Sequence, residues 1–99
     1  MSQQPYNAPV GLSYSHISNA GTNVVKTAPG MLQAININQG ASAAAATVYD
    51  NIAGSGSVVA VITLGAAVTT PQPIPYGVNL TKGLAIVTTG SIDLTVVYR

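Results

Sequence analysis

Short apolar runs rich in Val, Ile, Thr and Tyr recur along this chain, and clusters of Gly, Pro, Asn and Ser separate them. Within several runs, apolar and polar residues alternate. The last run, at 91–99, places four apolar side chains on one side of an extended chain: Ile92, Leu94, Val96 and Tyr98. A period of two residues is typical of a β-strand with one buried face. The pattern therefore predicts an all-β protein.

Eight runs are assigned to strands, with turn residues between them. They cover residues 11–18, 22–27, 31–38, 46–51, 58–64, 69–77, 83–90 and 91–99. Seven or eight short strands in 99 residues is the size of a single-domain β-sandwich, either jelly-roll-like or immunoglobulin-like. The run at 69–77 contains Pro71, Pro73 and Pro75. Because proline donates no ladder hydrogen bond, we expect an edge strand or a crossover there.

Three connections carry expectations of their own. The Gly/Ser-rich stretch at 53–57 and the pair Thr89-Gly90 each predict a hairpin between the strands that they join. The segment ASAAAA at 41–46 has high helix propensity. Isolated helices shorter than about 12 residues are nevertheless marginal. We expect a loop at 41–46, with a single helical turn as the alternative.

The apolar pattern also predicts which strands are central and which side chains are buried. The run VVAVITL at 58–64 is apolar on both faces, which indicates a central strand with both faces covered. In the run at 31–38, Ile35 and Ile37 lie on one face, and the two asparagines between and after them lie on the other. The predicted core contains Ile35, Val59, Val61, Ile86, Ile92, Leu94 and Val96.

The first ten residues differ from the rest of the chain. They are polar, contain Pro5 and Pro9, and offer few apolar side chains to pack on a domain. We interpret residues 1–10 as an extended arm and residues 11–99 as the sandwich. The arm and the residues directly after it are expected to contact a partner through Pro5, Tyr6, Pro9, Val10, Leu12 and Tyr14.

The N-terminus has no basic start followed by an apolar segment, so we expect no signal peptide. The most apolar stretch, at 58–68, is too short to cross a bilayer. These features favour a protein that is made in a cytoplasm and is not inserted in a membrane.

Charged residues make up 5% of the chain, where a soluble domain typically has roughly 25%. The formal net charge is +1, which gives copies little electrostatic repulsion. We interpret this composition as that of a protein packed against other proteins. A monomer of low charge is the alternative.

Residues able to carry out chemistry are scarce. There is no cysteine, and His16 is the single histidine, so we expect neither a metal site nor a cofactor. Asp50 and Asp93 either form an acid–base couple or, as we favour, each caps a turn or pairs with a single cation. No run of basic residues suggests nucleic-acid binding. We expect that the chain is not an enzyme.

From residue 46 onward, an ordered series of motifs resembles a family of small all-β virion proteins of tailed bacteriophages. The motifs are TVYDN at 47–51, VVAVITL at 58–64, YGVNLTKGLAIVTTG at 76–90 and DLTVVYR at 93–99. A weaker similarity extends to APGMLQAININQG at 28–40. The matches are strand patterns and turn residues, and they cover about two-thirds of the chain.

The resemblance implies a structural role on the surface of the phage head, as a decoration or cement protein. The implied partners are the major capsid protein or other virion proteins, together with further copies of the chain, with a trimer favoured. The family offers no catalytic residues to transfer. The alternative hypothesis is a binding module of a fibre, tail or vertex that recognises a host-surface glycan. Glycan recognition normally uses exposed aromatic side chains beside carboxylates or amides, and the five tyrosines are spread along the chain.

Overall fold

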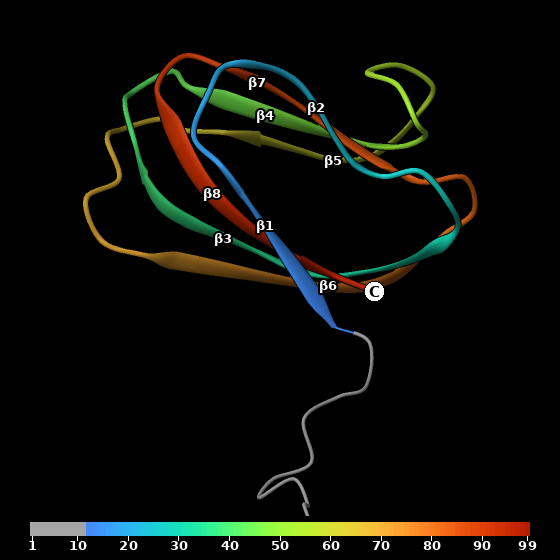
Figure 1. The fold of residues 1–99 in the computed structure, drawn as a ribbon. Helices are drawn as coiled ribbons and strands as arrows, with labels where there is room; N and C mark the ends of the chain where they lie inside the picture. The colour runs from blue at the N-terminus through green and yellow to red at the C-terminus, as the bar shows by residue number, and fades with distance from the viewer. Residues whose placement is uncertain (1–11) are drawn as a thin grey trace, which may run out of the picture.

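The computed structural model describes residues 12–99, and within this range it contains eight β-strands and no helix (Figure 1). The strands are β1 (Ser13–Ile17), β2 (Gly21–Lys26), β3 (Gly30–Gly40), β4 (Ala45–Asp50), β5 (Ser57–Thr63), β6 (Gln72–Leu80), β7 (Leu84–Thr89) and β8 (Ile92–Tyr98). They form a single-domain β-sandwich, which confirms the predicted all-β class and the number of strands.

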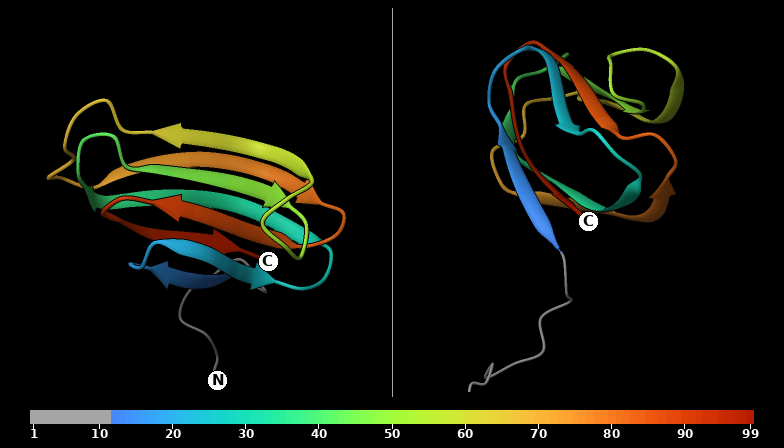
Figure 2. Two further views of the ribbon diagram at one scale, coloured as in Figure 1. Left: turned by 90° about the horizontal axis from the view of Figure 1, so that it is seen from above. Right: turned by 45° about the vertical axis from the view of Figure 1, so that its right-hand side comes forward.

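The eight strands form two antiparallel sheets of four that pack face to face (Figures 1 and 2). Sheet A has the order β1-β8-β3-β6, and sheet B has the order β2-β7-β4-β5. Successive strands alternate between the sheets, except that β4 and β5 are neighbours. This arrangement is a jelly roll, the first of the two sandwich types that the sequence suggested.

The core lies between the inward faces of the two sheets. The strand alternation places Leu32, Ile35 and Ile37 of β3 inward, and all three are buried. The same face of β8 carries buried Ile92, Leu94 and Val96, which confirms the predicted register. Sheet B contributes other buried side chains, namely Ala46, Val48, Ile62, Leu84 and Ile86. Side chains of the two sheets thus share one apolar cluster.

The predicted hairpin at Thr89-Gly90 is wrong, because β7 and β8 belong to different sheets. β7 pairs with β2 and β4, whereas β8 pairs with β1 and β3. The connection carries the chain across the sandwich instead, with Gly90 at a φ of 76°. A short Gly-containing turn permits either geometry. Here the crossing lets the apolar face of β8 cover that of β7, which a hairpin within one sheet does not do.

The prediction that the run at 58–64 is a central strand is also wrong. β5 is the last strand of sheet B and pairs only with β4 among the described strands. Of the two valines predicted to be buried in this run, Val61 is 65% exposed and Val59 is half-buried against the core. Val61 is exposed because the register with Thr47 places it on the outward side of an edge strand, whereas the adjacent Ile62 faces the core and is buried.

Other local predictions agree with the structure. The loop at 51–56 joins β4 and β5 as a hairpin. The Pro-rich run corresponds to β6, which is an edge strand of sheet A. Residues 41–44 form a turn, with Ala43 at a φ of 68°, and lead into β4 without a helix. The asparagines Asn36 and Asn38 lie on the face of β3 opposite to Ile35 and Ile37.

Replacing Leu94 by alanine tests the register of β8. Leu94 is fully buried in the shared core, so we expect Leu94→Ala to lower the free energy of unfolding by about 2–5 kcal/mol. Urea denaturation followed by circular dichroism measures this change. The control is Val24→Ala, because Val24 lies on the outer face of sheet B and is 49% exposed. Its expected cost is less than about 1 kcal/mol. Equal costs for both variants contradict the assigned core.

Candidate functional site

Of the residues expected to contact a partner, two lie in the part of the chain that the structure describes. Leu12 is half-buried just before β1, and Tyr14 on β1 is 74% exposed. Pro5, Tyr6, Pro9 and Val10 lie outside the described residues, as does the boundary at residues 10 and 11. The structure therefore places an exposed aromatic ring on sheet A and leaves the arm as a prediction.

A polar cluster occupies the outer face of sheet A. The Nε2 atom of His16 lies 2.7 Å from Oδ1 of Asp93, and the Nδ2 group of Asn38 donates to the same oxygen at 2.7 Å. Asn38 also donates to Oγ1 of Thr95 at 3.0 Å and accepts from Nδ2 of Asn36 at 2.6 Å. The ladders bring β1, β8 and β3 side by side, and so join residues far apart in the sequence.

The cluster stabilises the ionised form of Asp93. The hydrogen bond from Asn38 is the main cause that holds the pKa of the Asp93 carboxyl below its ordinary value, and the hydrogen bond and charge of His16 add to it. Partial burial acts in the opposite direction. Because a carboxylate only accepts hydrogen bonds, Nε2 of His16 carries the proton between the two groups. In neutral His16 the other ring nitrogen, Nδ1, is then an acceptor.

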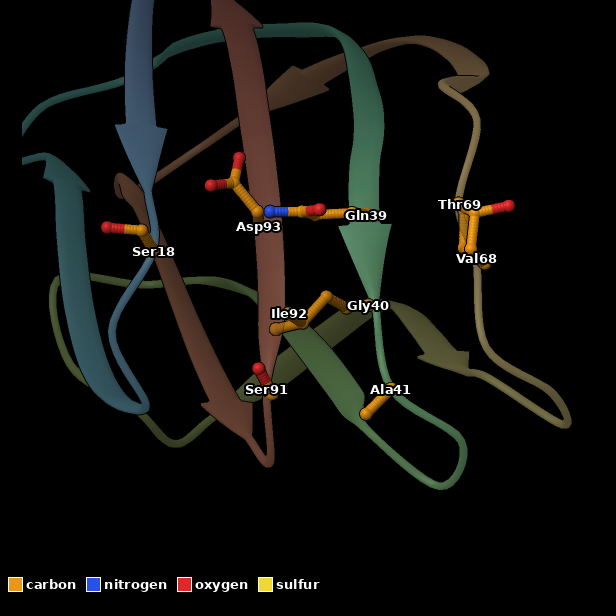
Figure 3. A pocket seen from close by; sticks show the side chains of 9 residues that line it. All are labelled: Ser18, Gln39, Gly40, Ala41, Val68, Thr69, Ser91, Ile92 and Asp93. Carbon is orange, nitrogen blue, oxygen red and sulfur yellow. The ribbon is translucent and has the colours of Figure 1, made fainter.

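A shallow hollow of about 540 Å³ adjoins this cluster at the ends of β3 and β8 (Figure 3). Its backbone is fixed by a pair of hydrogen bonds between Gly40 and Val68, at 2.8 and 3.0 Å. Its polar side chains belong to Ser18, Gln39, Thr69, Ser91 and Asp93, and its apolar lining to Ala41, Val68 and Ile92. Among these lining residues there is one carboxylate and no aromatic ring. The hollow offers hydrogen bonds to a small polar ligand and no stacking surface.

In the described residues, the histidine and the two carboxylates form neither a metal site nor an acid–base couple. Residues 12–99 contain no group of three or more His, Cys, Asp or Glu that could hold a metal ion. Asp50 lies at the end of β4 in sheet B, and Asp93 lies on β8 in sheet A, each with its own hydrogen-bond partners. The structure therefore does not bring the two carboxylates together as an acid–base couple. The absence of enzymatic activity stays a prediction.

Asp50 caps a turn, as the favoured hypothesis proposed, but the turn is distant in sequence. Its carboxylate accepts hydrogen bonds from the backbone N–H groups of Thr81, Lys82 and Gly83 and from the hydroxyl of Thr81. The backbone bonds from Thr81 and Lys82 are the main reason that the pKa of Asp50 falls to about 2. The contact ties the end of β4 to the turn between β6 and β7.

The outer face of sheet B has a different character. Val48 and Ile86 are paired across β4 and β7 and are buried in the core, so the residues that alternate with them along each strand of sheet B face outward. These residues are Thr22, Val24, Ala45, Thr47, Tyr49, Val58, Val61, Thr63, Ala85, Val87 and Thr89. None of them is charged, and Val58 and Val61 are 53% and 65% exposed. We call this set the outer face of sheet B.

Part of this outer face is covered by the chain itself. The loop at 51–56 passes so close to it that a Cβ atom on Gly54 would lie 2.7 Å from Val87 and 3.1 Å from Thr22. The loop is held by Asn51, whose Nδ2 donates to the carbonyl of Ser55 at 2.7 Å and whose Oδ1 accepts from the N–H of Ile52. The loop thus lies over β7 and β2 and leaves Val61 on β5 open.

His16, Asp50 and Asp93 were identified from the sequence as candidate chemical groups, but their hydrogen-bond partners were not. Asn38 and Thr95 were visible as polar residues alternating with apolar ones, which is the signal that placed them on an outer face. The order β1-β8-β3 that joins them could not be predicted, because six other strands separate β1 from β8 along the chain and four separate β3 from β8.

Comparisons with protein-family models, with curated proteins and with solved structures give no match to this chain. Among residues 12–99, no helix has the length and apolar character needed to span a membrane.

The low pKa of Asp50 predicts an acid-sensitive contribution to stability. Because the pKa of Asp50 is about 2 in the folded protein, below its ordinary value of 3.8, the contribution is present above about pH 4 and is lost as the pH falls towards 2. We expect Asp50→Asn to be less stable at pH 7 and to lose less stability than the wild type between pH 4 and pH 2. Thermal unfolding across this pH range measures the difference.

The matched control is Thr81→Val, which removes only the hydroxyl donor and keeps the backbone donors to Asp50. We expect this variant to retain most of the acid-dependent loss of stability. A wild-type profile that Asp50→Asn leaves unchanged contradicts the capping role.

Proposed function

We propose that this chain is a non-enzymatic structural subunit of a tailed-bacteriophage particle, which decorates or cements the capsid head through apolar and backbone contacts. The observation that carries this proposal is the outer face of sheet B. It joins exposed valines with threonines and alanines, without a charged side chain. Apolar surface of this kind is favourable to bury against a partner.

The engagement of the carboxylates supports the same function. Asp50 is bonded to the turn at 81–83, and Asp93 is bonded to His16 and Asn38. Both acidic groups thus stabilise the subunit itself. The net charge of the chain is +1, so its electrostatic attraction to an oppositely charged partner is weak. Binding to a particle is therefore expected to rest on burial and on backbone hydrogen bonds.

The resemblance of TVYDN, VVAVITL and the later motifs to small virion proteins of tailed phages suggests the head as the location. The major capsid protein is then the main partner, and further copies of this chain assemble with it. Jelly rolls occur in viral capsid domains and also in lectins, so the fold is compatible with more than one function.

A second candidate is a glycan-binding module of a fibre, tail or vertex. The hollow beside Asp93 favours it, because a carboxylate, the Gln39 amide and several hydroxyls can hydrogen-bond a sugar. Tyr14 is the exposed aromatic residue on the same sheet. The hollow itself has no aromatic lining, which makes this the weaker of the two candidates.

Counting copies on purified particles tests the proposal. Particles that carry the protein are washed at increasing NaCl concentration, and the copies per particle are then determined by quantitative mass spectrometry. We expect hundreds of copies, and we expect that they remain bound from low to molar salt, because screening weakens only ion pairs. The capsid protein of the same particles is the internal control for recovery.

Two outcomes contradict the proposal. A dozen copies or fewer identifies a tail, fibre or vertex component and favours the glycan-binding candidate. Release at moderate salt shows that ion pairs hold the protein, which the uncharged outer face of sheet B cannot supply.

Deletion of residues 2–10 tests the role of the arm. Because β1 begins at Ser13 and the core comes from later residues, we expect the truncated protein to fold with an unchanged circular dichroism spectrum. We expect fewer copies of it per particle when it complements a phage that lacks the full-length protein. Full incorporation shows that the arm is dispensable, and loss of folding shows that the arm belongs to the sandwich.

A further inference from the structure

The four edge strands of the sandwich differ in how well they resist pairing with another chain. β6 carries Pro73 and Pro75, and β2 has a bulge beside Lys26, two features that normally protect an edge. β1 is five residues long and mainly polar. β5 has seven residues, SVVAVIT, with neither proline nor charge. Among the described strands, β5 is therefore the edge best suited to accept another strand.

β5 also has the sequence of a strand with two neighbours. Apolar residues at both parities, from Val58 to Ile62, are typical of a central strand. In the single subunit, β5 nevertheless lies along one side of the molecule, as Figure 2 shows in yellow in its left view. A central-strand sequence at an edge position indicates that a neighbouring strand is missing.

The backbone of β5 presents hydrogen-bonding groups to this open side. Leu64 donates to the carbonyl of Ala44 at 2.9 Å and accepts from the N–H of Ala43 at 2.7 Å, so its backbone groups face β4. In an antiparallel ladder, the backbone groups of successive residues point alternately towards one neighbouring strand and the other. Val61 and Thr63 alternate with Leu64 and Ile62, so their N–H and C=O groups point away from β4, towards the open side. The bulge at Val59 limits the regular part of β5 to residues 60–63, and the hydrogen bonds of Leu64 continue its regular pairing by one residue, to a stretch of 60–64.

We propose that β5 pairs antiparallel with β5 of a second copy of this chain, about a two-fold axis at Ile62. Val61 of each copy then lies opposite Thr63 of the other, and the outward backbone groups of both residues are satisfied. Ile62 is the centre of the regular stretch 60–64, so the whole stretch is used. Sheet B of one subunit continues into sheet B of the other, which makes a sheet of eight strands.

A second copy fits this edge better than another partner for two reasons. Neither β5 nor the outer face of sheet B carries a charged side chain, so two identical edges meet without repulsion between like charges. The other edges resist pairing, so that β5 has no suitable acceptor in a head-to-tail arrangement. The self-complementary contact closes after two subunits.

The open part of the outer face of sheet B extends this contact. The loop at 51–56 covers the side near β2 and β7. Val61 and Thr63 stand on the uncovered side, beside the proposed axis. Pairing brings Val61 of each copy against Thr63 of the other and removes part of its apolar surface from water.

Pairing through β5 is a property of the isolated protein and does not require a phage particle. Experiments can therefore contradict β5 pairing without contradicting the proposed function, and the reverse. Sedimentation velocity and light scattering of the full chain give the mass over a range of concentrations. We expect a reversible dimer of twice the 9.9 kDa subunit. In hydrogen exchange of the dimer, we expect the amides of Val61 and Thr63 to be protected.

Three variants at one position separate the contributions of backbone and side chain. Val61→Pro removes an N–H that has no partner in the single subunit and blocks the edge, while Val61→Lys places two like charges close to the axis. We expect each to raise the dimer dissociation constant more than about tenfold and to expose the amide of Thr63. Val61→Ala keeps the N–H, and we expect it to remain a dimer. Circular dichroism establishes that each variant is folded.

Several results overturn the proposal. One is a wild-type protein that stays monomeric at high concentration. Another is a trimer, the order favoured from the sequence, since three subunits cannot share one two-fold edge contact. A third is a dimer that persists in folded Val61→Lys with the amide of Thr63 still unprotected, because the interface then lies elsewhere.

Discussion

The burial of one apolar face of each sheet against the other is the constraint on which the rest of the structure depends. In sheet A, Ile35 and Leu94 lie on adjacent strands with no exposed surface, and in sheet B Val48 and Ile86 do the same. Burying a side chain of this size contributes about 1.5–3 kcal/mol. With neither disulfides nor metal ligand clusters in the described part, this packing is the main source of stability.

The same constraint decides what the outer faces can carry. Because inward and outward positions alternate, every polar residue between two core residues must face out, and Asn36, Asn38, Asp93 and Thr95 do so together on sheet A. On sheet B the outward positions hold Thr, Ala, Tyr and Val instead. The sandwich thus has one outer face with a hydrogen-bonded polar cluster and one without charge, although both sheets follow the same alternating rule.

Alternation is local, and for this reason the strands themselves could be predicted from the sequence. Ile92, Leu94 and Val96 are buried as expected, and the prolines of β6 correctly indicated an edge. Which strands pair is decided by contacts between distant residues. The turn at Gly90 is compatible with a hairpin or with a crossing between sheets, and only the packing of β8 over sheet B selects the crossing. The partners of His16 and Asp50 were unpredictable for the same reason, since they lie 77 and 31 residues away.

The prediction that β5 is a central strand was wrong for a different reason, because there the local sequence pattern and the position of the strand in the sheet disagree. At β6 and β2 the sequence agrees with the edge position, through prolines in one strand and a bulge with a lysine in the other. At β5 the sequence is apolar on both faces, as is typical of a strand with neighbours on both sides. Natural edges without such protection tend to pair with other chains. The disagreement therefore arises when the fold is considered one subunit at a time, and it disappears when β5 is given a second neighbour.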